Sequence, residues 1–349
     1  MRVVVVGASG NVGTSLLARL AEEPAVDSVL GLARRVAELE FPKTEWAHAD
    51  IATSDLARRF RGADCVVHLA WVIQPSHDQE RMWRTNVEGS ARLFRAVKEA
   101  GVGNLVYASS VGAYSRGPKD RLVDETWPTD GIRTSFYARH KAEVERQLDR
   151  FEREAPDVRV VRMRPALTFK REMGAGARRL FLGPFVPNPL LRPGAIPVFP
   201  DTPGFRFQAV HSDDVAAAYG LAITSAVSGA FNLAAEPVLD SREFARLLDA
   251  RLVPVPGSAL RAVTALTWRL HLQPTPAGWI DLALGVPLLD ATRARKELGW
   301  TPARTASEAF LEILAGIREG VGLETPPLAP GTGGPARARE VLSGIGGRE

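Results

Sequence analysis

Short apolar runs alternate with longer amphipathic stretches over the first 165 residues of the chain. The apolar runs predict strands at residues 3–6, 29–32, 65–69, 105–108 and 158–162, and a further strand around 46–49. Between them, apolar residues recur every three or four positions and predict helices at 12–21, 87–100 and 136–153. This order is typical of βαβ units, so we expect an α/β fold with a doubly wound parallel sheet.

The pattern changes after Pro165. Residues 183–204 are crowded with prolines and cannot hold a long helix. Helical periodicity returns at 213–222, 241–252 and 305–318, which predicts a smaller, mostly helical C-terminal domain. Glycines and prolines from residue 322 onward predict a mobile tail.

Composition narrows the class of protein. The chain has 349 residues and is 45% hydrophobic, enough for about two domains with a large buried core. Its formal net charge is only +4, which gives little support for nucleic-acid binding. Cys65 is the only cysteine, so neither an internal disulfide nor a cysteine-based metal site can form. We expect a protein of the reducing cytoplasm, with no metal.

No segment predicts a membrane span. The apolar opening is far too short for a signal-peptide core and leads directly into a glycine-rich turn. The apolar stretch 252–289 is interrupted by Arg261, Arg269, His271 and Asp281, whose burial in lipid would be costly. The sequence therefore predicts neither a membrane partner nor a nucleic-acid partner.

A glycine-rich turn lies between the first predicted strand and the first predicted helix. Tight βα turns favour glycine in general, but at the first such junction glycines also let the backbone approach a pyrophosphate at a helix N-terminus. The candidate cofactor-binding residues in this turn are Gly7, Gly10, Asn11, Val12 and Gly13.

Tyr137 and Lys141 lie four residues apart in the predicted helix 136–153, so both side chains share one face. A free phenol has a pKa of ~10, and a fixed neighbouring cation lowers that pKa. Tyr137 could then exchange a proton with a substrate. Such pairs also occur by chance, but Ser109 and Ser110 end a predicted strand upstream and add a hydroxyl to the set.

The GxxGxxG turn, Ser110, Tyr137 and Lys141 resemble, in order and context, the extended short-chain dehydrogenase/reductase family of NAD-dependent epimerases and dehydratases. The resemblance covers about residues 1–315 and implies an N-terminal Rossmann domain. It implies that Ser110 orients a substrate oxygen, Tyr137 moves the hydroxyl proton and Lys141 lowers the pKa of Tyr137. Hydride would pass between a substrate carbinol carbon and the nicotinamide.

Two arginines stand where the cofactor's adenosine ribose is expected. An acid about 20 residues beyond the glycines would bind the 2′-hydroxyl of NAD, but the sequence there ends in Arg34-Arg35. A guanidinium can pair with a 2′-phosphate, so Arg34 or Arg35 favours NADP over NAD. A solvated arginine pair at a strand end is the alternative.

The resemblance assigns four more residues to the cofactor. Asp50 and Ile51 match the position that contacts adenine, and Leu69 and Ala70 match the segment whose backbone lines the cofactor. Asp50 could equally cap a helix.

The resemblance also suggests how the chain is divided. We assign residues 1–165 with 207–232 to a dinucleotide-binding Rossmann domain, 166–206 with 233–320 to a substrate-binding domain, and 321–349 to the tail. The apolar stripes at 93–97 and 144–151 could form a four-helix homodimer contact, although the same stripes would suffice to cover the sheet.

The small-molecule substrate is left open. Val111 and Gly112 follow Ser110 where sugar dehydratases of the family carry an acid pair, which argues against that reaction. Nucleotide-sugar enzymes commonly carry an arginine four residues before the position of His211; here that residue is Phe207, and Arg206 is one residue away.

Three functions therefore remain. An oxidoreductase or epimerase could act on a secondary alcohol or ketone such as a nucleotide sugar. A ketone or aldehyde reductase could take a less polar substrate, which the aromatic residues Phe181, Phe185, Trp268 and Trp279 would suit. A non-catalytic NADP-binding sensor is the third, although such relatives typically lack the tyrosine and lysine pair.

Overall fold

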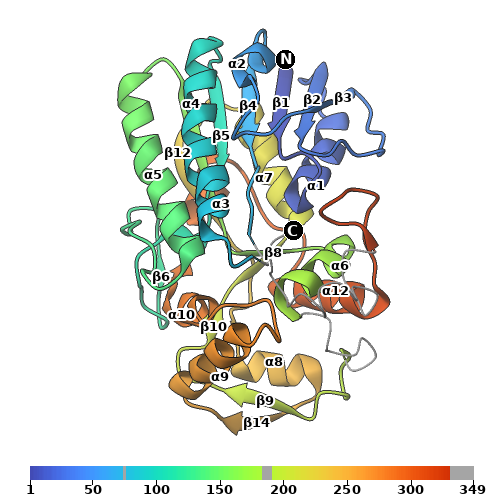
Figure 1. Cartoon of the computed structure of the whole chain (residues 1–349), viewed down its shortest axis with the longest axis vertical. Helices are drawn as coiled ribbons and strands as arrows, with labels where there is room; N and C mark the ends of the chain where they lie inside the picture. Colours follow the sequence, from blue (N-terminus) through green and yellow to red (C-terminus); the bar gives the residue numbers. More distant parts are fainter. Residues whose placement is uncertain (74–75, 183–190, 331–349) are drawn as a thin grey trace.

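The computed structural model describes residues 1–73, 76–182 and 191–330 of the chain. A seven-stranded parallel sheet forms its centre, in the order β12-β7-β5-β4-β1-β2-β3 (Figure 1). The strands are β1 (Arg2–Val6), β2 (Ser28–Ala33), β3 (Thr44–His48), β4 (Cys65–His68), β5 (Asn104–Ala108), β7 (Arg159–Pro165) and β12 (Gly229–Leu233). The predicted doubly wound Rossmann sheet is thus confirmed.

Successive valines of β1 face opposite sides of the sheet. Val3 and Val5 belong to a core with the helices α1 (Asn11–Ala21) and α7 (Ser212–Thr224). Val4 and Val6 belong to a second core with α2 (Leu56–Phe60), α4 (Gly89–Glu99) and α5 (Phe136–Glu154). Helices cover both faces, which is why the central strands read as unbroken apolar runs.

The apolar stripes that could have formed a dimer contact pack inside the protein, against the sheet. Leu93, Val97, Val144 and Leu148 are buried in the core that α4 and α5 form with the sheet. The homodimer stays a prediction.

The C-terminal part is smaller and mainly helical, with short strand pairs. Its helices are α6 (Gly174–Ala177), α8 (Ser241–Leu248), α9 (Gly257–Arg269), α10 (Gly278–Gly285), α11 (Thr292–Glu297) and α12 (Ala306–Glu319). Its strands are β8 (Leu167–Phe169), β9 (Val198–Asp201), β10 (Arg206–Phe207), β11 (Ala209–His211), β13 (Leu239–Asp240), β14 (Arg251–Pro254) and β15 (Leu288–Leu289). Strand β15 pairs with β6 (Leu122–Val123).

In the N-terminal half, a short helix, α3 (Gln79–Trp83), and a π-helical turn, Arg84–Glu88, precede α4.

The predicted helix 241–252 is too long. Helix α8 ends at Leu248 because Asp249 adopts the left-handed conformation (φ 53°, ψ 48°) as its C-cap. The following residues form β14, which pairs in parallel with β9.

The segment 321–330 packs onto the protein. Thr325 and Leu328 are buried, and Pro327 lies beside Gly176 of α6. The remainder of the predicted tail, 331–349, lies outside the described residues. No described helix is long and apolar enough to cross a membrane.

Candidate active site

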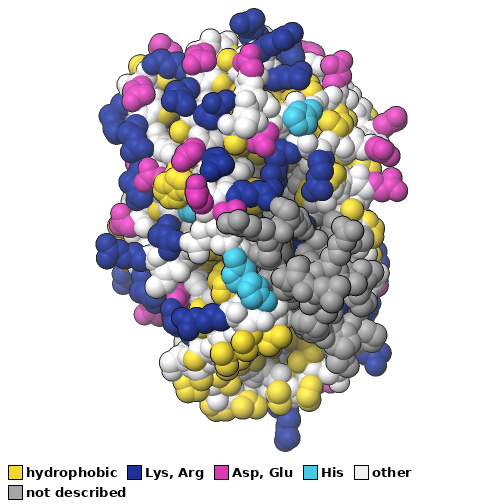
Figure 2. Space-filling view, in the orientation of Figure 1, with side chains coloured by type: hydrophobic (Ala, Val, Ile, Leu, Met, Phe, Trp, Pro, Cys, Tyr) yellow, Lys and Arg dark blue, Asp and Glu magenta, His cyan; other side chains and the backbone are white. Residues whose placement is uncertain are grey.

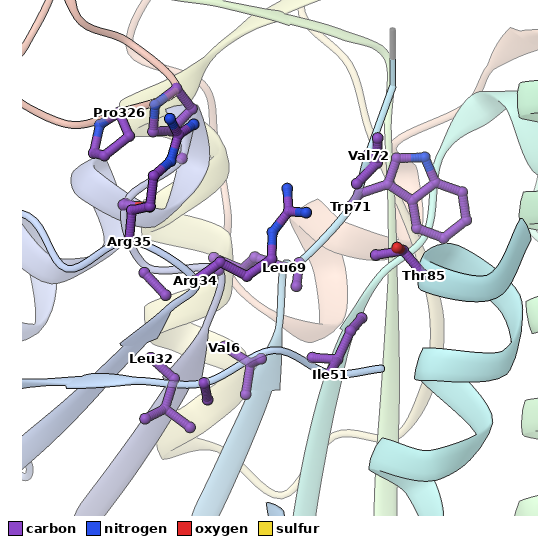
Figure 3. Close-up of a pocket in the computed structure, with 17 residues that line it drawn as sticks. Val6, Leu32, Arg34, Arg35, Ile51, Leu69, Trp71, Val72, Thr85 and Pro326 are labelled. Atoms are coloured by element: carbon purple, nitrogen blue, oxygen red, sulfur yellow. The ribbon is translucent and has the colours of Figure 1, made fainter. Parts of the chain in front are cut away.

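A cleft opens above the C-terminal ends of β1, β2 and β4, where the strand order reverses (Figure 3). Its empty volume is about 720 Å³, including space open to solvent. It is lined by Val6, Gly7, Ser9, Gly10, Leu32, Ala33, Arg34, Arg35, Ala49, Ile51, Leu69, Ala70, Trp71, Val72, Thr85, Pro326 and Pro327. Dinucleotides bind at this switch point in open α/β sheets.

The glycine turn leaves its backbone open to the cleft. Gly7 has φ +90°, and a Cβ there would stand 2.5 Å from the backbone nitrogen of Ala70. A Cβ on Gly13 would stand 2.5 Å from the carbonyl oxygen of Ala8, so α1 packs closely on the turn. Gly10 lines the cleft as the N-cap of α1 and provides no side-chain acceptor for the helix's first N–H groups. This arrangement fits a pyrophosphate.

The side chains of Asn11 and Val12 contact other parts of the protein and do not line the cleft. Asn11 donates through Nδ2 to the Thr168 carbonyl at 3.2 Å and accepts from the Ser212 hydroxyl at 2.9 Å. Val12 packs against the core. A cofactor contact from either residue would therefore use the backbone.

The two arginines lie at the rim of the cleft. Arg34 and Arg35 are both exposed, and both line the cleft (Figure 3). The structure shows no ion pair for either guanidinium within residues 1–73, 76–182 and 191–330. Both guanidinium groups can therefore meet an anion in the cleft.

The four remaining cofactor candidates divide in two. Ile51, Leu69 and Ala70 line the cleft. Asp50 is not part of its lining, and its Oδ1 accepts a hydrogen bond from the Ala52 amide at 2.8 Å. The contact of Asp50 with adenine stays a prediction.

Ser110 and Tyr137 are brought together across a short 3₁₀ turn, Val111–Ala113. Ser110 is buried and accepts a hydrogen bond from the Gly112 amide at 3.0 Å, and a Cβ on Gly112 would stand 2.7 Å from the Tyr137 ring and 3.5 Å from the Ser110 hydroxyl oxygen. Tyr137 follows the first residue of α5, whose N-cap Ser135 accepts from the Ala138 amide. Burial raises the pKa of Tyr137 to about 12, and the Ser110 hydroxyl opposes part of that rise.

Lys141 lies one helical turn further along α5 and is 3% exposed. Its Nζ donates to the Ala108 carbonyl at 2.6 Å and stands 3.5 Å from the centroid of the Trp71 ring and 6.0 Å from that of Tyr137. Burial lowers the pKa of Lys141 well below its usual range, and the charge of Glu145 acts in the opposite direction.

This electrostatic arrangement differs from the sequence-based expectation. Lys141 was expected to lower the pKa of Tyr137, but burial dominates and raises it. The Lys141 ammonium is held by a carbonyl and by the Trp71 face instead. A proton-exchanging role for Tyr137 therefore begins from the neutral phenol.

A buried ionic network supports the site from below. The Ser109 hydroxyl donates to Glu145, which pairs with Arg162 at 2.8 Å and with Arg164 at 2.9 Å. Burial alone would raise the pKa of Glu145. The charges and hydrogen bonds of Arg164, and then of Arg162, outweigh that effect and lower the pKa to about 2. The network holds Ser109, the neighbour of Ser110, in place. It also anchors α5, the helix that contains both Glu145 and Lys141. Sequence reasoning missed it because its members are far apart along the chain.

Three aromatic side chains, Trp71, Trp279 and Phe181, form a group beside Tyr137 that we call the aromatic wall. The ring of Tyr137 lies 6.0 Å from Trp71 and 5.2 Å from Trp279, and Trp279 lies 5.5 Å from Phe181. The Nε1 atoms of Trp71 and Trp279 are buried and find no hydrogen-bond partner in the described part of the chain. Sequence reasoning identified Phe181 and Trp279 but missed Trp71.

The other two aromatic candidates do not join this wall. Trp268 stacks on His77 with the ring centroids 3.6 Å apart. Phe185 lies outside the described residues.

Comparison with known proteins establishes the family. Residues 3–234 match the NAD dependent epimerase/dehydratase family, and the chain belongs to it. The family resemblance predicted from sequence is confirmed.

The chain is also similar to a longer relative. It is 29% identical over 327 residues to an uncharacterized protein of Mycobacterium tuberculosis, covering 93% of this chain. The chain spans 31% of that relative's length.

Two solved structures share the fold. The UDP-glucuronic acid 4-epimerase of Bacillus cereus, in complex with UDP-glucuronic acid and NAD, is 16% identical, with a TM-score of 0.68 over 91% of this chain and 99% of that chain. The UDP-glucose 4-epimerase of Thermus thermophilus, in complex with NAD, is 23% identical, with a TM-score of 0.66 over 92% of this chain and 100% of that chain.

Proposed function

We propose that this enzyme transfers hydride between a nicotinamide dinucleotide and a substrate that is a secondary alcohol or a ketone. The observation that carries the proposal is that Ser110 and Tyr137 both lie against Gly112, with Lys141 buried on the same helix as Tyr137. When bound, the dinucleotide supplies or accepts the hydride. A sensor would not need this set of proton-handling groups, so the geometry favours catalysis.

Each residue has a distinct role in this proposal. Tyr137 keeps its proton at neutral pH, because its pKa is about 12, and can give it to a ketone oxygen during reduction. Ser110 orients that oxygen through its hydroxyl. Lys141 places a cation within 6.0 Å of the Tyr137 ring, where it stabilises the phenolate formed when the proton leaves.

NADP is the dinucleotide that we propose. Arg34 and Arg35 line the cleft, are exposed, and can pair with a 2′-phosphate. The family and the two solved neighbours are associated with NAD, so the choice between the two cofactors rests on these arginines.

The aromatic wall favours a weakly polar substrate. Trp71, Trp279 and Phe181 offer ring faces beside Tyr137, which suit the apolar groups of a ketone.

A nucleotide sugar is the second candidate substrate, because the chain also holds a cluster of cations. Lys119 donates to the Arg206 carbonyl at 2.8 Å, and the Arg116 guanidinium, which lies against Gly285, acts on it electrostatically. Burial, and then the charges of Arg116 and Arg206, lower the pKa of Lys119 to about 7. Such a cluster suits a diphosphate.

The test combines two measurements on the purified protein. Mass analysis of released nucleotide identifies the cofactor, and the absorbance of reduced cofactor is followed while candidate substrates are added. Consumption of NADPH by apolar ketones supports the proposal. Turnover of a UDP-sugar with tightly held NAD would favour the second candidate, and no turnover with either class would contradict catalysis by this site.

A further inference from the structure

The lower end of the molecule carries an exposed apolar surface (Figure 2). Figure 1 places α9, β9 and β14 there. We define the apolar end surface as Val198, Leu252, Val253, Val263, Leu266, Leu270 and Leu272, each 36% to 61% exposed. These are most of the exposed large apolar residues in the described chain, so their gathering at one end is not the scattered exposure of an ordinary surface.

Helix α9 is built to present this surface. Val263, Leu266 and Leu270 follow a spacing of three and four residues, so they form one stripe along the helix and its C-cap. Their exposures of 61%, 59% and 57% show that the stripe faces solvent. The helix contains no buried residue, so the stripe is not needed to hold the fold together.

The charges within segment 250–280, which carries most of this surface, are all of one sign. The segment contains Arg251, Arg261 and Arg269 and no aspartate or glutamate. Arg261 pairs with Asp281 of α10 at 2.9 Å. Arg251 and Arg269 have no ion pair within the part of the chain that the structure describes, and both are exposed.

We propose that the apolar end surface docks on an anionic lipid membrane. Apolar side chains beside arginines are the composition of a helix that lies in the membrane interface, where the side chains enter the acyl boundary and the arginines meet lipid phosphates. A second copy of the chain is a poorer occupant. Two-fold packing of α9 would bring the Arg269 side chains of both copies to one interface, and segment 250–280 has no carboxylate to pair with them, while Asp281 is already paired with Arg261.

The docked surface lies next to the candidate active site. The ion pair between Arg261 and Asp281 joins α9 to α10, and Trp279 of α10 packs against Tyr137. Docking through α9 therefore holds the aromatic wall close to the lipid. The proposal departs from the sequence-based expectation of no membrane partner, but it requires no membrane span.

The experiment is co-sedimentation of the full chain with two kinds of vesicle, phosphatidylcholine alone and phosphatidylcholine mixed with phosphatidylglycerol. The wild type is expected to sediment with the mixed vesicles and less with phosphatidylcholine alone, and added salt should reduce the difference. The double variant Leu266→Glu, Leu270→Glu should bind the mixed vesicles at least about tenfold more weakly than the wild type.

Matched variants separate the contributions. Leu311→Glu adds a charge at an exposed leucine of α12 and should bind like the wild type. Arg251→Ala with Arg269→Ala should lose the preference for mixed vesicles, whereas Arg59→Ala with Arg95→Ala, two exposed arginines of the Rossmann domain, should keep it. Circular dichroism and cofactor binding check that each variant folds.

Three results would overturn the proposal. The wild type could stay in the supernatant with mixed vesicles, or the Leu266→Glu, Leu270→Glu variant could bind as well as the wild type. A concentration-dependent dimer in sedimentation velocity that this variant abolishes would assign the surface to a second copy instead.

Discussion

Gly112 lies directly against the ring of Tyr137: a Cβ on Gly112 would stand 2.7 Å from Cε1 of Tyr137 and 3.5 Å from the Ser110 hydroxyl oxygen. Glycine is therefore required for the two catalytic candidates to meet. The backbone amide of the same residue donates to Ser110 at 3.0 Å. Gly112 is thus a positioning residue for both hydroxyl groups.

Gly112→Ala should lower kcat by about ten- to a hundredfold, because the added methyl group displaces the Tyr137 ring. Dinucleotide affinity should change little, since Gly112 is not part of the cleft lining. Steady-state kinetics and a cofactor titration separate the two effects. Gly103→Ala is the control, because a Cβ there meets nothing within 4 Å. Equal kcat values for the two variants would refute the positioning role.

Arg34→Ala and Arg35→Ala should weaken NADPH binding far more than NADH binding. Loss of a charge-assisted contact with the 2′-phosphate should raise the Kd for NADPH about tenfold or more in at least one variant, and raised salt should reduce the difference. Fluorescence titration with both cofactors measures this. If both variants bind the two cofactors as the wild type does, the arginine pair is simply solvated and the preference for NADP is wrong.

Glu145→Gln should destabilise the protein by about 3–5 kcal/mol at neutral pH, because it leaves Arg162 and Arg164 buried without their carboxylate. Glu143→Gln on the same helix is the control, since its partners Arg146 and Arg150 are exposed and such surface pairs contribute about 1 kcal/mol or less. Urea unfolding compares the free energies of the two variants.

The effect of Glu145 should depend on pH. Its pKa is about 2 in the folded protein and 4.5 ordinarily, so the unfolded chain takes up a proton first as pH falls. The stabilisation is complete above pH 4.5 and is lost as pH falls toward 2. The difference between wild type and Glu145→Gln should shrink over that window; a difference independent of pH would contradict the ion-pair account.

The sequence predicted those features that depend on local pattern. The valines of β1 and the spacing of Tyr137 and Lys141 follow from periodicity, and the structure has both the strand and the helix. The end of α8 was missed because Asp249, and not a glycine, takes the left-handed conformation.

Contacts between distant segments could not be predicted. Trp71 reaches Lys141 from a distant part of the chain, and Glu145 meets Arg164 only after α5 packs on the sheet. The same limit applies to pKa values: the helical spacing predicts that Lys141 acts on Tyr137, whereas tertiary burial decides the pKa of each.

The central claim is that Tyr137 moves the substrate proton. The most direct test is the rate of NADPH oxidation by the Tyr137→Phe variant, with an active ketone and with cofactor affinity measured in parallel. Tyr219→Phe, which removes a buried phenol hydroxyl from the core, is the control. The account predicts that Tyr137→Phe loses about a hundred- to ten-thousandfold in rate at nearly unchanged cofactor affinity, while Tyr219→Phe stays active. A Tyr137→Phe enzyme as fast as the wild type would contradict it.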